Sequence, residues 1–293
     1  MIKKSQSLLL ATITVGLATA ASAGPTYTSV DFPGAVATTL NGGPNPEGTN
    51  IGTYTDTSGV IHGFTLQNGI YTTIDPPGSS LTVPNWISPQ GEIVGEYLDA
   101  AGVAHGFTLA DGIYATVDYP GAGGSALDGL NPPGEMVGFF CTTAALCTAG
   151  FEHSYVRTKD GGFVAFDPPG ASSSLAASVT SSGVIVGSYA INGGSVNGNT
   201  LGYKLDQGVL TTIQYPNSVS TFAGAINFEG TIVGDWVDAA GNGHGFILNG
   251  STFSSFDFPG GAFTDAAGIN PNGVIVGIYF TADGAEHGFI RTP

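Results

Sequence analysis

Residues 268–279 read Gly-Ile-Asn-Pro-Asn-Gly-Val-Ile-Val-Gly-Ile-Tyr, and the pattern of this stretch decides the fold because it occurs six times. The glycine that ends each Ile-Val-Gly or related triplet recurs at steps of 43, 43, 49, 47 and 43 residues. Another glycine stands four residues earlier and an aromatic residue two residues later in every copy. The triplet glycines and their aromatics are Gly52 and Tyr54, Gly95 and Tyr97, Gly138 and Phe140, Gly187 and Tyr189, Gly234 and Trp236, and Gly277 and Tyr279.

Each repeat unit is expected to contain four short strands separated by turns. In the last unit, strands are predicted around 266–269, 274–280 and 287–291, with turns at 270–273 and at Asp283-Gly284. The fourth strand is clearer in earlier units, where Pro and Gly end it and turn the chain. Those corners read Asp31-Phe32-Pro33-Gly34, Asp118-Tyr119-Pro120-Gly121 and Asp257-Phe258-Pro259-Gly260.

A unit of about 43 residues with four strands is typical of a β-propeller blade. Six units therefore predict an all-β, six-bladed β-propeller that forms one domain over residues 24–293. The segment 27–31 has the character of a fourth strand without the first three, and the chain ends just after a third strand. We expect the N-terminal strand to join the last blade, which closes the ring and removes its free edges.

The composition agrees with a turn-rich β fold and excludes several other classes. The 293 residues include 47 Gly and 17 Pro, and glycine at this level is unfavourable for helical bundles. Six basic residues stand against 22 acidic ones, for a net charge of −16, which is unsuited to binding a nucleic-acid phosphate backbone. Hydrophobic residues make up 42%, too many for a disordered acidic chain.

The repeat also resembles a known family. Residues 268–277 followed by His287-Gly288-Phe289, and residues 226–234 followed by His244-Gly245-Phe246, are similar to the HAF-type extracellular repeat of secreted bacterial proteins. That family usually has Ala in the middle of the His triplet, where this chain mostly has Gly. The resemblance implies export and a repeat architecture, and it brings no catalytic residues with it.

The N-terminus predicts export. Lys3 and Lys4 precede an apolar stretch from Leu8 to Ala20, and Ala21-Ser22-Ala23 forms a small-residue cleavage site. This order is typical of a secretory signal peptide, so residues 1–23 are expected to be removed. An uncleaved membrane anchor is the alternative, although the apolar stretch is short for a span. We therefore expect a secreted protein, extracellular or periplasmic, with no membrane span in the mature chain.

Cys141 and Cys147 are the only cysteines. In an exported protein they are expected to form a disulfide that closes a small surface loop. A free thiol pair or half of a metal site are the alternatives, and His153 is the only nearby residue that would serve as a further metal ligand.

All five histidines occupy one repeat position, and the remaining copy has Leu201 there. A two-residue loop at Asn68-Gly69 would form a type I′ hairpin that places His62 opposite Asp75. The same counting predicts five pairs, His62 with Asp75, His105 with Asp118, His153 with Asp167, His244 with Asp257, and His287 with Asp31 across the ring closure. Five copies without a recurring nucleophile favour a structural cross-strand pair over a catalytic dyad.

The loops that join strand four to strand one and strand two to strand three should share one strongly acidic face. Asp residues serve well in turns, but Ca²⁺ or a cationic partner is the functional alternative. Two insertions, 141–150 and 191–199, fall in the two-to-three loops of adjacent blades and are expected to wall a groove there. Trp86, on a first strand, would either stack on a sugar or plug the channel. The candidate ligand residues are Trp86, Asp99, Asp238, Gly193 and Asn197.

These features predict a secreted, non-catalytic propeller that serves as a binding or structural module, with an extracellular glycan or protein as partner. The alternative is a secreted propeller hydrolase or lyase acting on polysaccharide. An enzyme should bring two or three unrepeated acidic or basic residues together at the channel mouth. We expect a monomer with no cofactor, and Ca²⁺ is the candidate metal although no Asp-x-Asp-x-Asp loop is present.

Overall fold

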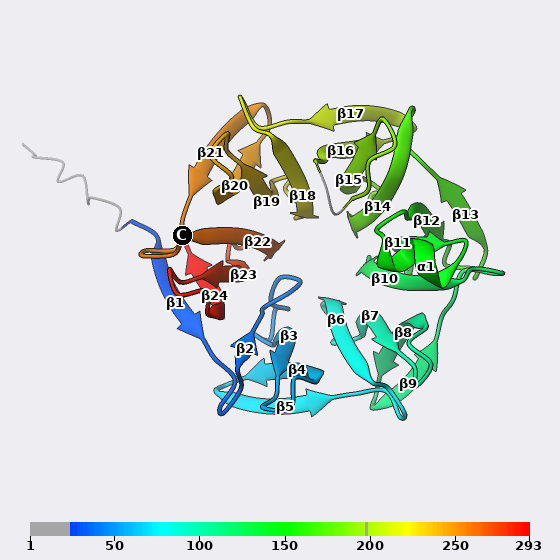
Figure 1. Cartoon of the computed structure of the whole chain (residues 1–293), viewed down its shortest axis with the longest axis horizontal. Helices are drawn as coiled ribbons and strands as arrows, with labels where there is room; N and C mark the ends of the chain where they lie inside the picture. The colour runs from blue at the N-terminus through cyan, green and yellow to red at the C-terminus, as the bar shows by residue number, and fades with distance from the viewer. Residues whose placement is uncertain (1–23, 197–198) are drawn as a thin grey trace, which may run out of the picture.

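The computed structural model describes residues 24–196 and 199–293 and consists of six four-stranded antiparallel sheets in a ring. Figure 1 shows the sheets as blades around a common axis, with the first strand of each blade innermost and the fourth on the outside. The predicted six-bladed β-propeller is therefore confirmed. Residues 1–23, which carry the predicted signal peptide, lie outside the described residues.

The first three blades run from residue 37 to residue 166. Blade 1 contains β2 (Ala37–Thr38), β3 (Asn50–Thr55), β4 (Ile61–Gln67) and β5 (Ile70–Ile74). Blade 2 contains β6 (Leu81–Ile87), β7 (Ile93–Leu98), β8 (Ala104–Ala110) and β9 (Ile113–Thr116). Blade 3 contains β10 (Gly124–Leu130), β11 (Met136–Cys141), β12 (His153–Arg157) and β13 (Phe163–Phe166), with the short helix α1 (Ala144–Thr148) between β11 and β12.

The second half of the ring repeats this order. Blade 4 contains β14 (Ala171–Val179), β15 (Ile185–Ile191), β16 (Leu201–Asp206) and β17 (Val209–Ile213). Blade 5 contains β18 (Ser220–Ile226), β19 (Ile232–Val237), β20 (Gly243–Asn249) and β21 (Thr252–Phe256). Blade 6 contains β22 (Phe263–Ile269), β23 (Ile275–Phe280) and β24 (Glu286–Thr292). Among the described residues no helix is long and apolar enough to span a membrane.

The fourth strand of blade 6 comes from the other end of the chain. Strand β1 (Thr26–Val30) pairs antiparallel with β24, with Tyr27 opposite Arg291 and Val30 opposite Gly288. In Figure 1 the blue β1 lies beside the red β24, close to the C-terminus. The predicted closure of the ring is confirmed, and the hydrogen bonds of β1 to β24 hold the two ends of the chain together.

The core lies between the blades and is built from one repeated position. The third residue of each His triplet, or of its variants, is fully buried between neighbouring blades; these residues are Phe64, Phe107, Tyr155, Tyr203, Phe246 and Phe289. They are among the largest side chains with no exposed surface, and burying one aromatic ring of this size contributes roughly 2–3 kcal/mol. The repeat therefore supplies one large aromatic to each of the six interfaces.

The triplet glycine is required by a close approach of strands one and two. A Cβ on Gly234 would overlap the backbone carbonyl of Phe222 on β18, and the other five triplet glycines face strand one in the same way. Next to this contact, strand one of five blades carries a register shift, as between Ala223 and Ala225. Such a bulge increases the local twist of the sheet, and only glycine leaves room for it.

We expect Gly234→Ala to destabilise the protein by about 3 kcal/mol, because the new methyl group would push β18 away from β19. Urea unfolding of the two proteins measures the change. Gly162→Ala is the matched control, since the one atom within 4 Å of a new Cβ there would be the Thr158 hydroxyl, at 3.2 Å, and no backbone atom of another strand lies so near. Equal losses in both variants would contradict the packing argument.

Candidate functional site

The five predicted His–Asp pairs are brought together at the rim of the ring. Each histidine, at the start of strand three, places its Nδ1 within hydrogen-bond distance of the aspartate that follows strand four. The distances are 2.8 Å for His62 and Asp75, 2.9 Å for His105 and Asp118, 2.9 Å for His153 and Asp167, 2.9 Å for His244 and Asp257, and 2.6 Å for His287 and Asp31. The register of β4 and β5 is the one expected from a two-residue turn at Asn68-Gly69.

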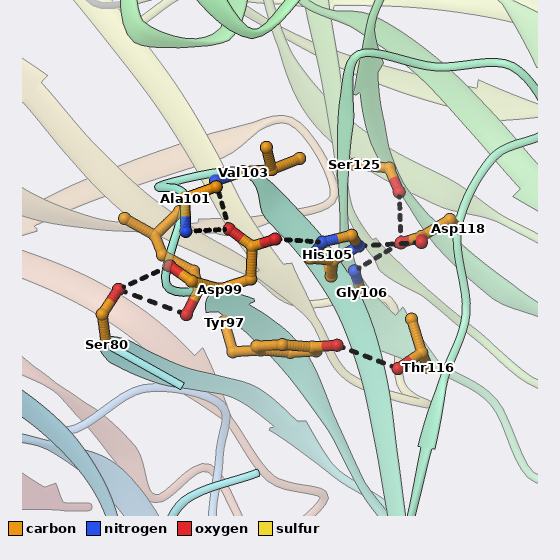
Figure 2. A network of polar contacts seen from close by, with 11 residues as sticks. Ser80, Tyr97, Asp99, Ala101, Val103, His105, Gly106, Thr116, Asp118 and Ser125 are labelled. Atoms are coloured by element: carbon orange, nitrogen blue, oxygen red, sulfur yellow. Dashed lines mark hydrogen bonds and ion pairs between the residues drawn. The ribbon is translucent and has the colours of Figure 1, made fainter. Parts of the chain in front are cut away.

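In three blades a second aspartate, which is not among the predicted pairs, lies on the other side of the imidazole. Asp99, in the two-to-three turn of blade 2, lies 3.6 Å from Nε2 of His105, and Figure 2 shows the imidazole between Asp99 and Asp118. The other Asp Oδ2 to His Nε2 distances are 3.6 Å for Asp56 and His62 and 3.7 Å for Asp238 and His244.

The turn itself holds this second carboxylate. One oxygen of Asp99 accepts hydrogen bonds from the backbone N–H groups of Val103 and Ala101, at 2.9 and 2.8 Å. These hydrogen bonds, first the one from Val103 and then the one from Ala101, hold the pKa of Asp99 below its ordinary value. Asp99 and Asp238, two of the candidate ligand residues, are thus already engaged in closing turns.

Each histidine also lies against the aromatic residue two positions after the triplet glycine, stacked in four blades and tilted in the His153–Phe140 pair. Tyr97 lies directly opposite His105 in the ladder, with ring centroids 5.2 Å apart. In four blades the aromatic corner of the preceding blade covers the other side of this residue, as where Phe32 stacks on Tyr54 at 3.7 Å and Tyr119 on Phe140 at 3.9 Å. The corners before blades 2 and 4 have Pro76 and Pro168 instead. These rim contacts, which we call the His–Asp belt, therefore link strands three and four within a blade and, at four of the six junctions, one blade to the next.

In the described part of the chain each belt histidine bonds through Nδ1 to an aspartate. In blade 2 the nearby Ser125 hydroxyl donates its hydrogen bond to Asp118 and not to His105. In blade 4 Leu201 replaces the histidine and Gln214 the aspartate, while Tyr189 keeps its place beside Leu201 in the ladder. These contacts support the structural interpretation of the five pairs.

His105→Ala should lower the free energy of unfolding by about 1–2 kcal/mol, because Asp99 and Asp118 both lose their partner. Thermal unfolding near neutral pH measures the loss. Gln214→Ala, at the blade position without a pair, should change stability by less than about 0.5 kcal/mol. A His105→Ala protein that melts with the parent would contradict the structural role.

The remaining candidate ligand residues do not converge with these aspartates. Trp86 lies at the end of β6 and lines a pocket of about 130 Å³ on the ring axis, among one-to-two turn residues that include Pro44, Pro132 and Pro271. The absence of a side chain at Gly42 leaves room for the indole of Trp86, and this indole packs against buried side chains of blades 3 and 6. Trp86 thus lines this end of the channel, at the face away from Asp99 and Asp238, and leaves a pocket beside it.

The two insertions meet on the acidic face. The Val196 N–H donates to the Gly150 carbonyl at 3.1 Å, and the Ser172 hydroxyl donates to the Gly194 carbonyl at 2.6 Å. Gly193 lies in the turn that follows β15, with a positive φ of 77°, and Asn197 falls outside the described residues. The predicted disulfide between Cys141 and Cys147 is present, and it closes the loop that contains α1.

A pocket of about 270 Å³ opens between blade 2 and this disulfide-closed insertion. Its walls come from β7 and β8 on one side and from β11 and α1 on the other; the lining residues are Glu96, Leu98, Gly102, Ala104, Phe139, Ala144, Cys147, Thr148 and Glu152. The first insertion therefore forms one wall of a recess on this face, whereas the described residues of the second insertion do not line it. The two carboxyl groups in the recess were not singled out by the sequence.

Glu96 and Glu152 occupy positions that vary between blades. Glu96 follows a triplet glycine, where the other blades have Thr53, Phe139, Ser188, Asp235 and Ile278. Glu152 precedes the His position, where the others have Ile61, Ala104, Thr200, Gly243 and Glu286. Glu152 is held in place through its backbone, since its N–H donates to the Ser173 hydroxyl of blade 4 at 2.9 Å.

A third carboxyl group, Asp128, stands nearby at the bulge of β10. It lines the central channel and accepts a hydrogen bond from the Asn85 side chain at 3.0 Å. Burial raises the pKa of Glu96 to about 7, and burial together with the charge of Glu96 raises the pKa of Glu152 to about 8. The pKa of Asp128 is also well above its ordinary value, through burial first and then the charges of Glu96 and Glu152.

These carboxyl groups lack cationic partners. Among the residues that the structure describes, no Lys, Arg or His lies within ion-pair distance of Glu96, Asp128 or Glu152. One oxygen each of Asp128 and Glu152 is buried without a hydrogen-bond partner. A buried charge of this kind must be neutralised by a proton or by a cation from outside.

The raised pKa values give stability a definite pH dependence. The folded protein holds protons on Glu96 and Glu152 more tightly than the unfolded chain, so the free energy of unfolding should fall as pH rises from about 4.5 to about 8. We expect Glu152→Gln to remove about 1–3 kcal/mol of this fall in urea titrations at pH 5 and pH 8. The exposed Glu229→Gln is the control and should follow the parent. An equal fall in all three proteins would contradict burial of the Glu152 charge.

The sequence matches no protein-family model and no curated protein. Solved structures of similar shape exist at low identity. A putative TolB from Agrobacterium tumefaciens has a TM-score of 0.58 at 13% identity, covering 86% of this chain and 89% of that one. Virginiamycin B lyase from Staphylococcus aureus, solved with quinupristin, has a TM-score of 0.54 at 12% identity over 92% and 100% of the two chains. Aleuria aurantia lectin, solved with Fucα1-6GlcNAc, has a TM-score of 0.52 at 13% identity over 87% and 91%.

These likenesses concern the fold. At 12–13% identity they place the chain among β-propellers with diverse roles, which include a lyase and a lectin. The molecule is a six-bladed β-propeller with a His–Asp belt at its rim and a carboxyl-lined recess, the blade 2/3 pocket, beneath a disulfide-closed insertion.

Proposed function

We propose that this chain is an exported β-propeller that serves as a non-catalytic binding module, with the blade 2/3 pocket as its ligand site. The observation that carries the proposal is the side chain of Glu152, which is only 8% exposed and has a carboxyl oxygen without a partner in a pocket-lining position. A buried carboxyl group that the fold leaves unsatisfied is costly for stability, and such a cost is typical of functional sites.

Export is part of the proposal. The basic, apolar and small-residue order of residues 1–23 predicts a signal peptide, and the Cys141–Cys147 disulfide is the kind of bond that persists in oxidising compartments. The resemblance to HAF-type extracellular repeats supports the same location. The expected partner is accordingly an extracellular glycan or protein, and the expected state of the molecule is a monomer.

The His–Asp belt contributes to this function indirectly. Its histidines bond to aspartates on one or both sides and lie against aromatic rings, so they are occupied in joining blades. The surface between the two-to-three loops is not used by the belt, so its residues are free to differ from blade to blade. The pocket lies beside the two-to-three loop of blade 3, which is longer than the others and is closed by the disulfide.

A secreted hydrolase or lyase is the second candidate, and one observation favours it. Acids also stand at the Glu96 position in blade 5 and at the Glu152 position in blade 6, as Asp235 and Glu286. The bulge position of Asp128 is Ala267 in blade 6, so blades 2 and 3 alone combine the three acids that an enzyme could use. The pKa values of about 7 and 8 for Glu96 and Glu152 suit a general acid or base at neutral pH. Depolymerisation of acidic or neutral polysaccharides that is abolished in Glu152→Gln would establish this alternative.

The binding function is tested on arrays. The mature protein should bind at least one extracellular glycan or peptide in a dose-dependent manner, with and without Ca²⁺, and Glu152→Gln should weaken that binding at least ten-fold. Glu229→Gln, an exposed carboxyl in a one-to-two turn of blade 5, should bind like the parent. Binding equal in parent and Glu152→Gln would remove the pocket from the proposal, and the absence of any binding would favour a purely structural role.

A further inference from the structure

We infer that the blade 2/3 pocket takes a primary ammonium group on an apolar stem, as on the lysine side chain of a protein partner. This inference rests on the proposed binding function and names its ligand chemistry. It starts from two independent observations: one carboxyl oxygen of Glu152 has no hydrogen-bond partner, and aliphatic and aromatic side chains line the same pocket.

The charges in the pocket call for a cation that the chain does not supply. Glu96 and Glu152 line the pocket, and Asp128 lies close enough to both to feel their charges. Only six Lys and Arg residues exist in the whole sequence against 22 acidic residues. The Asp-rich turns on the same face add a negative field around the pocket mouth, which would draw a cationic group toward it.

The walls of the pocket suit the stem of that group. Leu98, Ala104 and Ala144 present aliphatic carbon, and Phe139 separates the pocket from the central channel because it lines both. A lysine side chain buries its methylene groups along apolar surface and carries its charge at the tip. An aromatic ring such as that of Phe139 also attracts a nearby cation.

Other cations match this lining less well. Ca²⁺ takes roughly six to eight oxygen ligands, whereas two carboxyl groups and the Thr148 hydroxyl are the polar side chains that line the pocket. An amino sugar would need partners for several hydroxyl groups besides its ammonium group, and beyond the two carboxyl groups the lining offers only the Thr148 hydroxyl as a polar side chain. A planar guanidinium prefers a two-oxygen carboxylate arrangement, whereas a single buried oxygen of Glu152 is unpartnered and suits one N–H donor.

The pocket is also built to keep its shape. The Cys141–Cys147 disulfide closes the loop that carries α1, and the Thr143 hydroxyl accepts a hydrogen bond from the Leu146 N–H at 3.3 Å as the N-terminal cap of this helix. The Gly150 carbonyl accepts from Val196 of the second insertion and from the Ser173 hydroxyl. A recess held on two sides loses less freedom when a ligand enters, which favours binding.

The test is a titration of the mature, isotope-labelled protein with Nα-acetyl-lysine methylamide, followed by NMR. The backbone amides of Phe139, Ala144 and Thr148 should shift saturably, and the uncharged analogue Nα-acetyl-norleucine methylamide should shift them at least ten-fold less at equal concentration. Glucosamine and Ca²⁺ are titrated in parallel. Tighter binding of either than of the lysine derivative would overturn the ammonium assignment.

Variants separate the site from general attraction to an acidic protein. Glu152→Gln and Glu96→Gln should each weaken lysine binding at least ten-fold, while Glu229→Gln should not change it. Removing a buried charge leaves the fold intact, and the unfolding curves of the same samples check this. Equal affinity in parent and Glu152→Gln would overturn the inference. Array binding that depends on Glu152 without any response to the lysine derivative would leave the proposed function standing and remove only the ligand class.

Discussion

The hydrogen bond between a strand-three histidine and the aspartate after strand four is the contact on which the rim of this ring depends. It fixes the end of the outer hairpin, and the aspartate begins the corner that leads to the next blade. The aromatic residue of that corner, where present, stacks on the aromatic residue beside the next histidine, as Tyr119 does on Phe140. A local hairpin contact thereby becomes a link between neighbouring blades, and closure by β1 completes the circle.

The His–Asp belt and the triplet glycines hold the blades in place. Other positions of the repeat are therefore free to vary in sequence. The side of strand two next to the triplet glycine holds Thr53 in one blade, Glu96 in the next and Phe139 in the third. In blades 5 and 6 the same freedom places Asp235 near Asp265, and burial together with their mutual repulsion raises the pKa of Asp235. Carboxyl groups accumulate along the channel where the fold itself does not need them, at a cost in stability that a function would explain.

The His–Asp pairs could be predicted because hairpin register is local. Two residues at Asn68-Gly69 set the partner of His62, and counting outward from the turn is sufficient. The second aspartates were within reach of the same reasoning, since strands two and three also form a hairpin. Glu96 and Glu152 were not, because 56 residues separate them and each alone looks like an ordinary strand or loop residue. Their proximity becomes evident only from the folded structure, in which both side chains line one recess.

The sequence by itself determined the number of blades, the strand order within a blade, the closure by the N-terminal strand and the rim pairs. All of these depend on periodicity or on turns of a few residues, for which hydrogen-bond geometry allows few alternatives. The tertiary structure alone decided that Trp86 lines a pocket at one end of the channel, and that the disulfide-closed insertion forms a wall of a recess with two carboxyl groups at the other face. Those outcomes depend on how neighbouring blades pack and on how an insertion lies against them, and neither is encoded in the spacing of the repeat.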